Sequence, residues 1–431
     1  MRKTVQVFEY RKLAVGEQGF EQRHFDRLVR YNDRHAGRYF VVGHNRIHFQ
    51  NWVGVIQVDD LTIEVLPKTD EVRGDTGGDP QLWHGVLVDM LRWSGFLKME
   101  LHANARLKLQ SASLLDIYLE VFLEDVQALA HHGLVKKYRR EQGNVGALKG
   151  RLVFAEHIRR NLIHRERFFT EHQRYDRDNA FNRILKAALG VVGRVARTPH
   201  LVSFANRLLL SFEDVTDVPV LAESFKRLAF CRNTERYRPA INLAELILLN
   251  YSPDLQGGRR DVLAILFEMD ALFERYVYTE LKRTERMDGG FTVDAQVSSQ
   301  FWTSPSTPTT IRPDIMLSFT GGPRITLDTK WKIPQAGRPA DADLKQMYAY
   351  NMIFGTERSY LVYPSVQNRK DEDGHFEPAK LGADGVVHHC GLLHAELLRN
   401  GKLNREFGRL LIEKLRVVES PIQGISCHGF A

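Results

Sequence analysis

Short runs of alternating apolar and polar residues occupy the first 70 positions of the chain. They cover residues 4–10, 37–43, 46–58 and 61–68, and Asp59 and Asp60 form a turn between the last two. A period of two predicts half-buried β-strands. Residues 82–96, 111–133 and 178–196 instead repeat apolar positions every three or four residues, which predicts helices.

A further amphipathic helix is predicted over residues 261–281. Its inward positions are Leu263, Leu266, Met269, Phe273 and Val277. The segment 250–258, rich in Pro, Gly and Asp, precedes it and predicts a domain boundary. The whole pattern favours an α/β (α+β) chain: a β-rich start, a helical middle and a mixed C-terminal part.

Residues 312–332 predict a β-hairpin that carries charge among apolar positions. Two β-type runs flank Gly321, Gly322 and Pro323. With a three-residue loop, Asp314 faces Lys330 and lies diagonal to Asp328, all on one face of the hairpin. A two-residue loop would move Asp314 to the other face, so we expect the longer loop or a bulge.

Two carboxylates and an amine on one face suit phosphodiester hydrolysis. Carboxylate oxygens are ligands for Mg²⁺, and the metal offsets charge on a phosphoryl oxygen and acidifies water. A neighbouring lysine orients the water or stabilises the transition state. On spacing alone, an ordinary cross-strand Asp–Lys pair at the surface explains the pattern equally well.

The motif resembles the core of the PD-(D/E)xK nuclease superfamily. Pro313-Asp314 is followed by Asp328-Thr329-Lys330, with Asp as the second acid, the less common choice. Gln346 and Tyr350 resemble the helical Gln-x-x-x-Tyr motif of the RecB-like branch, and their spacing places them on one helical face. The resemblance implies that an upstream helix supplies another acid to the metal site. Glu274 is the candidate, with Glu268 as the alternative.

Four further blocks resemble McrC, the nuclease family of McrBC-type, 5-methylcytosine-specific restriction systems. They are residues 53–68, 148–161, 175–189 and 269–277, in the family's order. The resemblance implies a restriction-endonuclease-like domain over residues 256–431, with a mixed sheet flanked by helices. It also implies a β-rich then helical adaptor over residues 1–140 and a basic, helical docking region over residues 141–255.

Composition is ordinary for a globular chain of 431 residues, with 43% hydrophobic and 26% charged residues. The start has no apolar signal segment, no run approaches a membrane span, and the three Cys residues have no paired spacing. We therefore expect a cytoplasmic protein. His388, His389, Cys390 and His394 fit no zinc-site spacing.

Basic residues are concentrated between residues 136 and 167, within a chain of net charge +7. Such a cluster is able to contact DNA phosphates. It is equally compatible with docking on an acidic partner or with a solvated face. The candidate nucleic-acid-binding residues are Lys136, Lys137, Arg139, Arg140, Arg159, Arg160, Arg165 and Arg167.

The chain contains no G-x-x-x-x-G-K-[ST] phosphate loop. It is therefore not predicted to hydrolyse nucleotides itself. The resemblance implies that a separate AAA+ GTPase ring supplies the motor, and that this chain docks on the ring, stimulates it and cuts DNA with Mg²⁺. The alternative is a non-catalytic DNA-binding and activating adaptor of the same kind of motor.

Overall fold

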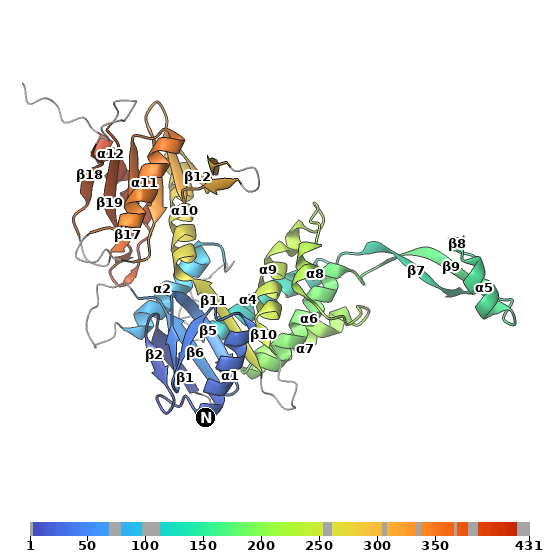
Figure 1. Cartoon of the computed structure of the whole chain (residues 1–431). Coiled ribbons are helices and arrows are strands. Elements are labelled where there is room, and N and C mark those ends of the chain that lie inside the picture. Colours follow the sequence, from blue (N-terminus) through green and yellow to red (C-terminus); the bar gives the residue numbers. More distant parts are fainter. Residues whose placement is uncertain are drawn as a thin grey trace, which may run out of the picture.

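The computed structural model describes residues 3–68, 79–96, 113–252, 261–303, 308–332, 338–365, 369–377 and 387–419. Most of the predicted boundary segment 250–258, together with Cys427, lies outside these ranges. The predicted α/β class is confirmed, since helices and mixed sheets alternate along the chain (Figure 1). In the part of the chain described, no helix combines the length and apolar character needed to cross a bilayer.

The N-terminal half is built on a five-stranded sheet. Its strands, in spatial order, are β1 (Lys3–Phe8), β6 (Leu61–Leu66), β5 (Trp52–Val58), β11 (Val262–Glu268) and β10 (Tyr251–Ser252). A smaller sheet holds β2 (Lys12–Ala14), β4 (Arg46–Phe49) and β3 (Phe40–Gly43). Helix α1 (Gln22–Arg34), which the sequence analysis missed, buries Phe25, Leu28 and Tyr31 in the same core.

Strand β11 corrects the prediction of one helix over residues 261–281. It pairs antiparallel with β5, about 200 residues earlier in the chain. Leu263 and Ile265 enter one core cluster, whereas Val262 and Ala264 enter another on the opposite face of the sheet. Gly54 permits this pairing, because a Cβ there would lie 2.1 Å from the carbonyl oxygen of Ile265. The C-terminal unit expected from residue 256 therefore begins after β11.

Helices dominate the middle of the chain. They are α2 (Pro80–Trp93), α4 (Leu114–His131), α6 (Ala180–Val195), α7 (Pro199–Leu209), α8 (Ala222–Lys226) and α9 (Arg238–Leu249), with short 3₁₀ turns η1 (Leu210–Phe212) and η2 (Glu235–Tyr237). Their buried side chains form one continuous core with β5, β11 and the C-terminal half. This shared core ties the N-terminal sheet to the unit that follows it.

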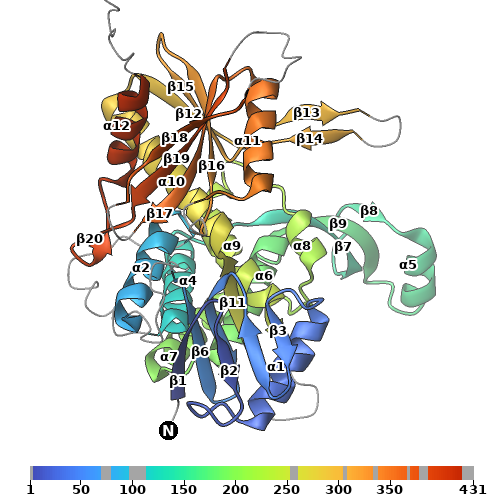
Figure 2. The ribbon, with the colours of Figure 1, turned by 60° about the vertical axis from the view of Figure 1, so that its left-hand side comes forward.

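A narrow β-arm projects from the helical region (Figures 1 and 2). It consists of β7 (Lys137–Val145), β9 (Phe168–Asp176), β8 (Arg151–Leu152) and, at its far end, α5 (Phe154–Asn161). The region expected to be basic and helical, residues 141–255, is helical from α6 onward, whereas its first part, up to Asp176, forms this arm. The strands β7 and β9 pair along nine residues, and ion pairs such as Arg139–Asp176 and Arg174–Glu141 support the ladder.

The C-terminal half is a three-layer α/β/α unit. Its sheet has the order β12 (Phe291–Ala295), β15 (Ile315–Phe319), β16 (Arg324–Thr329), β17 (Arg358–Ser365), β19 (His389–Glu396) and β18 (Glu372–His375), with parallel and antiparallel pairs. Helices α10 (Met269–Asp288) and α12 (Phe407–Glu419) cover one face, and α11 (Asp341–Phe354) covers the other. Two short hairpins complete the unit: β13 (Ser299–Trp302) with β14 (Thr309–Ile311), and β20 (Leu398–Arg399) with β21 (Lys402–Leu403).

Candidate active site

The predicted hairpin is present as β15 and β16, but its register differs from the predicted one by two residues. Ser318 pairs with Arg324, and the same register continued places Asp314 across from Asp328 rather than Lys330. The loop is accordingly longer, from Phe319 to Pro323. A shift of two residues leaves every side chain on its original face, so the predicted convergence of the charged groups is preserved.

Asp314 is held in place by the residue after Asp328. The backbone N–H of Thr329 donates to Oδ2 of Asp314 at 2.7 Å, and the Thr329 hydroxyl donates to the same oxygen at 2.8 Å. Two donors fix the rotamer of a carboxylate that follows a proline and sits at the start of a strand. Asp314, the first acid of the motif, is therefore oriented by Thr329, the residue that follows the second acid.

Asp328 and Lys330 form a buried ion pair on the face that α11 covers. Nζ of Lys330 lies 2.7 Å from Oδ2 of Asp328. Burial, followed by the neighbouring Asp314 charge, raises the pKa of Asp328 to about 6. Burial disfavours the charged amine of Lys330, but the Asp328 and Asp343 carboxylates together outweigh the effect of burial and raise the lysine pKa. Lys330 is therefore a cation at neutral pH.

Glu274 of α10 approaches the same site, as the resemblance implied. Its Oε1 accepts a hydrogen bond of 2.5 Å from the side-chain amide of Gln296. Burial raises the pKa of Glu274, and burial together with the Glu274 charge raises that of Asp314. The alternative, Glu268, lies at the start of α10, where Asn51 donates to it at 3.3 Å. The electrostatic link to Asp314 favours Glu274.

The Gln-x-x-x-Tyr motif lies on α11, and its tyrosine contacts Asp328. Nε2 of Gln346 donates to the Tyr350 hydroxyl at 2.7 Å. The hydroxyl of Tyr350 lies 2.9 Å from the carbonyl oxygen of Arg312 and 3.4 Å from Oδ1 of Asp328. Because Met347 and Tyr350 are buried against β17 and β19, the helix cannot turn this face away. Tyr350 thus connects both strands of the hairpin.

Asp343 is a site residue that the sequence analysis missed. Its two carboxylate oxygens each lie 3.4 Å from an amine, Oδ1 from Lys330 and Oδ2 from Lys332. The signal was present in the sequence, since Asp343 lies three and seven residues before Gln346 and Tyr350, which places it on the same helical face. Asp343 is a second acidic neighbour of Lys330, so the amine lies between Asp328 of β16 and Asp343 of α11.

The donor set fits a hard divalent cation. Asp314 and Asp328 offer carboxylate oxygens from one face of the hairpin, and Glu274 adds a third negative charge nearby. Over the ranges that the structure describes, no three His, Cys, Asp or Glu side chains are grouped so as to hold a metal ion by themselves. Mg²⁺ characteristically takes one or two carboxylates and completes its shell with water and phosphate oxygens. Burial, and then the neighbouring carboxylates, raise the pKa values of Asp314 and Asp328, and a bound cation would favour their ionised forms.

The eight basic candidates lie on or beside the arm, away from these carboxylates (Figure 1). Several of them pair with acids of the arm itself: Arg159 and Arg160 both bind Glu156, and Arg139 binds Asp176. The far end of the arm also exposes large apolar side chains among these charged ones. They are Leu148, Phe154, Ile158, Leu162 and Ile163.

Comparisons with known proteins agree with one another. A family model described as "McrBC 5-methylcytosine restriction system component" matches residues 47–364. The Escherichia coli K12 "Type IV methyl-directed restriction enzyme EcoKMcrBC" is 23% identical over 193 residues, which cover 44% of this chain and 55% of the relative. The match thus spans about half the length of that relative.

Two solved structures match this chain, and the first of them shares its fold. One is a half-complex from a tetradecameric assembly of Thermococcus gammatolerans McrB AAA+ hexamers with bound McrC. It has a TM-score of 0.65 and 18% identity, and the alignment covers 96% of this chain and 100% of that chain. The other, the McrBC complex of the same organism, has a TM-score of 0.49 and 21% identity, and covers 65% of this chain and 87% of that one.

Proposed function

The chain belongs to the family of McrBC 5-methylcytosine restriction system components, and we propose that it is the subunit of such a system that cleaves DNA. In this proposal it is a Mg²⁺-dependent endodeoxyribonuclease of the PD-(D/E)xK type. It docks on an AAA+ GTPase ring formed by a separate McrB-like subunit, stimulates GTP hydrolysis there, and cuts phosphodiester bonds of DNA.

The observation that carries the proposal is the convergence of four elements on one site, in which Asp328 is buried and Asp314, Lys330 and Glu274 are half-buried. The hairpin β15–β16 supplies Asp314, Asp328 and Lys330, α10 supplies Glu274, and α11 supplies Gln346 and Tyr350. An ordinary surface Asp–Lys pair would be exposed and would not need three further polar groups from two helices. Burying this much charge is costly, and a function that requires it is the simplest explanation.

Each residue has a role that follows from its position. Mg²⁺ bound by Asp314 and Asp328 would supply positive charge that offsets a phosphodiester's own charge and acidifies nearby water. Lys330, a cation between Asp328 and Asp343, orients water or stabilises charge that develops on the phosphoryl oxygens. Thr329 and Tyr350 keep the two aspartates in position, so that the reacting groups need no rearrangement.

The arm is the proposed docking element for the GTPase ring. An exposed apolar cluster on α5 and its flanking loops is a surface for protein rather than for phosphate. The acids that pair with the arm's arginines reduce its attraction for DNA. The eight basic residues are retained as candidate phosphate contacts, to be separated from docking by experiment. The relative solved with bound McrB hexamers supports a partner of this type.

The test combines both subunits, GTP, Mg²⁺ and methylated plasmid DNA, with each component also left out in turn. We expect cleavage only with all components present, and a higher GTPase rate when this chain joins the ring. If the purified chain alone linearises plasmid efficiently, it is a free-standing nuclease. If the complete mixture raises GTPase activity and never cuts DNA, the chain is the non-catalytic adaptor.

A further inference from the structure

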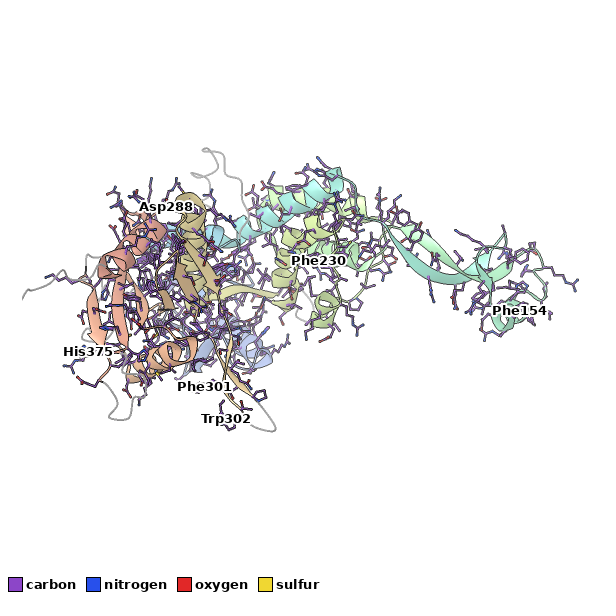
Figure 3. The ribbon with its side chains drawn as sticks, turned by 90° about the horizontal axis from the view of Figure 1, so that it is seen from above. Phe154, Phe230, Asp288, Phe301, Trp302 and His375 are labelled. Atoms are coloured by element: carbon purple, nitrogen blue, oxygen red, sulfur yellow. The ribbon has the colours of Figure 1, made fainter. Side chains whose placement is uncertain are left out.

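A small hairpin beside the candidate active site exposes two large aromatic side chains. Strands β13 and β14 form a two-stranded sheet of their own and project from the C-terminal unit next to α11 (Figure 2). Phe301 is 54% exposed and Trp302 is 56% exposed. Figure 3 shows both side chains on the projecting hairpin, away from the packed body of the molecule. Nothing in the fold requires apolar groups of this size there.

The base of this hairpin is built from the same residues that surround the acids. The backbone N–H of Gln296 donates to the carbonyl oxygen of Asp314 at 2.9 Å, while its side chain donates to Glu274. At the other strand, Ile311 packs against the cluster that contains Tyr350, and the Arg312 carbonyl accepts from the Tyr350 hydroxyl. The hairpin is therefore fixed to the catalytic groups on both sides.

Gln296 adopts a backbone conformation that side chains other than glycine rarely take, with φ of 52°. Such strain persists where surrounding contacts impose it, and it is concentrated at functional sites. Here it lets one residue turn the chain out of β12 into the hairpin and still reach Glu274. The direction in which Phe301 and Trp302 project is thus set by a residue that also touches the site.

The charge of this segment is suited to DNA. Residues 295–313 contain no Asp or Glu, although acids make up 53 of the 431 residues of the chain. Its described strands carry Ser, Thr and Gln side chains, which donate hydrogen bonds to phosphates, and Arg312 adds a positive charge. Exposed aromatic groups in such surroundings insert between base steps or stack on bases.

We infer that the β13–β14 hairpin contacts the duplex beside the bond to be cut, with Phe301 and Trp302 placed against the bases. The inference rests on the proposed function, because it takes DNA as the substrate of the Asp314–Asp328 site. It adds a positioning element to that site. The exposed apolar side chains at the far end of the arm then contact a protein partner, whereas this hairpin contacts DNA.

The first test uses the fluorescence of Trp302 in the full chain carrying Asp328→Asn, which is not expected to cut. Trp52, Trp83 and Trp331 are buried and Trp93 is half-buried, so added quencher reaches Trp302 more readily than the other tryptophans. A short duplex should change the emission and protect it from acrylamide, and Trp302→Phe in the same background should abolish that change. A response that survives Trp302→Phe, or no response at all, overturns the inference.

The second test measures cleavage by the assembled complex. The double variant Phe301→Ala/Trp302→Ala should cut at least about tenfold more slowly at low DNA concentration, with ring assembly and GTPase stimulation unchanged. Met287→Ala is the matched control. Met287 is 76% exposed and neighbours Asp288, which lies on the other side of the unit from Phe301 and Trp302 (Figure 3).

The outcomes separate the two proposals. Equal cleavage by the wild type and the double variant rejects the hairpin inference alone. Loss of ring assembly in the double variant also rejects it, because the hairpin would then be a protein interface. A wild-type complex that never cleaves DNA rejects the proposed function, and the hairpin inference with it.

Discussion

Oδ2 of Asp328 lies 2.7 Å from Nζ of Lys330, two residues farther along the chain and directly after β16. The carboxylate is almost fully buried, and the amine also neighbours Asp343. The ion pair with Asp328 therefore holds the Lys330 amine in position. Loss of either partner leaves the other buried with altered charge.

We accordingly expect Asp314→Ala, Asp328→Ala and Lys330→Ala each to lower cleavage by the complex at least about 100-fold. Because the three groups act together, double variants should be little worse than single ones. Plasmid cleavage and ring-stimulated GTPase activity are measured in parallel, and stimulation should persist in all three variants. Asp288→Ala, which removes an exposed carboxylate at the end of α10, is the control. An Asp328 variant that still nicks DNA at nearly the wild-type rate would contradict the site assignment.

Tyr350→Phe should reduce cleavage by about tenfold without unfolding the protein. The change keeps the buried ring but removes the hydroxyl that contacts the Arg312 carbonyl and Asp328. A net hydrogen-bond contribution of about 1–1.5 kcal/mol sets the expected size. The Mg²⁺ concentration for half-maximal cleavage should also rise, because Asp328 loses a positioning contact.

Tyr348→Phe is the matched control, since Tyr348 lies on the same helix and its ring contacts Phe376 and His388 instead. Equal effects of the two substitutions would show that the Tyr350 hydroxyl has no special role.

The stability of the metal-free protein should depend on pH through Asp328. Its pKa rises from 3.8 in the unfolded chain to about 6 in the folded one, so the folded state binds the proton more tightly. The cost of the ionised form is fully present above about pH 6 and disappears below about pH 4, which corresponds to about 3 kcal/mol. As far as Asp328 is concerned, the free energy of unfolding should therefore rise by about 2 kcal/mol when pH falls from 7 to 4, and the rest of the gain comes below pH 4.

Asp328→Asn removes the ionisation. In EDTA the variant should melt at a higher temperature than the wild type at pH 7.5, and the difference should shrink toward pH 4. Addition of Mg²⁺ should stabilise the wild type alone. A pH-independent difference between the two proteins would show that Asp328 does not carry this charge.

Substitution of the exposed apolar side chains at the far end of the arm should weaken docking on the GTPase ring without affecting DNA binding. Phe154→Ser, Leu162→Ser and Ile163→Ser together should lower GTPase stimulation at least tenfold, because association loses buried apolar area. All three side chains are exposed, so the thermal stability of the isolated chain should not fall.

The contrasting variant reverses Arg159, Arg160, Arg165 and Arg167 to Glu. If these residues bind phosphates, DNA affinity should fall and its dependence on salt concentration should become shallower. If they serve only the partner, GTPase stimulation falls and DNA affinity is retained. Unchanged binding of both would mean that this part of the arm is a solvated face.

Much of the candidate site follows from the sequence alone. Alternation along a strand placed Asp314, Asp328 and Lys330 on one face, and helical spacing placed Gln346 beside Tyr350; the structure bears out both local arrangements. These relationships depend only on the repeat of a strand or a helix, which is the same in every protein. The strands β1, β5 and β6 of the N-terminal sheet were predictable for the same reason, whereas β11 was not.

Other features depended on contacts between distant segments. Residues 262–267 form a continuous apolar run, which is equally compatible with a buried helix and a buried strand. Pairing with β5 decides for the strand, because only then do alternate residues fill two cores on opposite faces. The approach of Glu274 to Asp314 and of Asp343 to Lys330 likewise required the packing of α10 and α11 on the sheet. The sequence by itself determined which side chains share a face of one element. Tertiary structure decided which faces meet, because burial of apolar surface between elements far apart in the chain is a property of the whole fold.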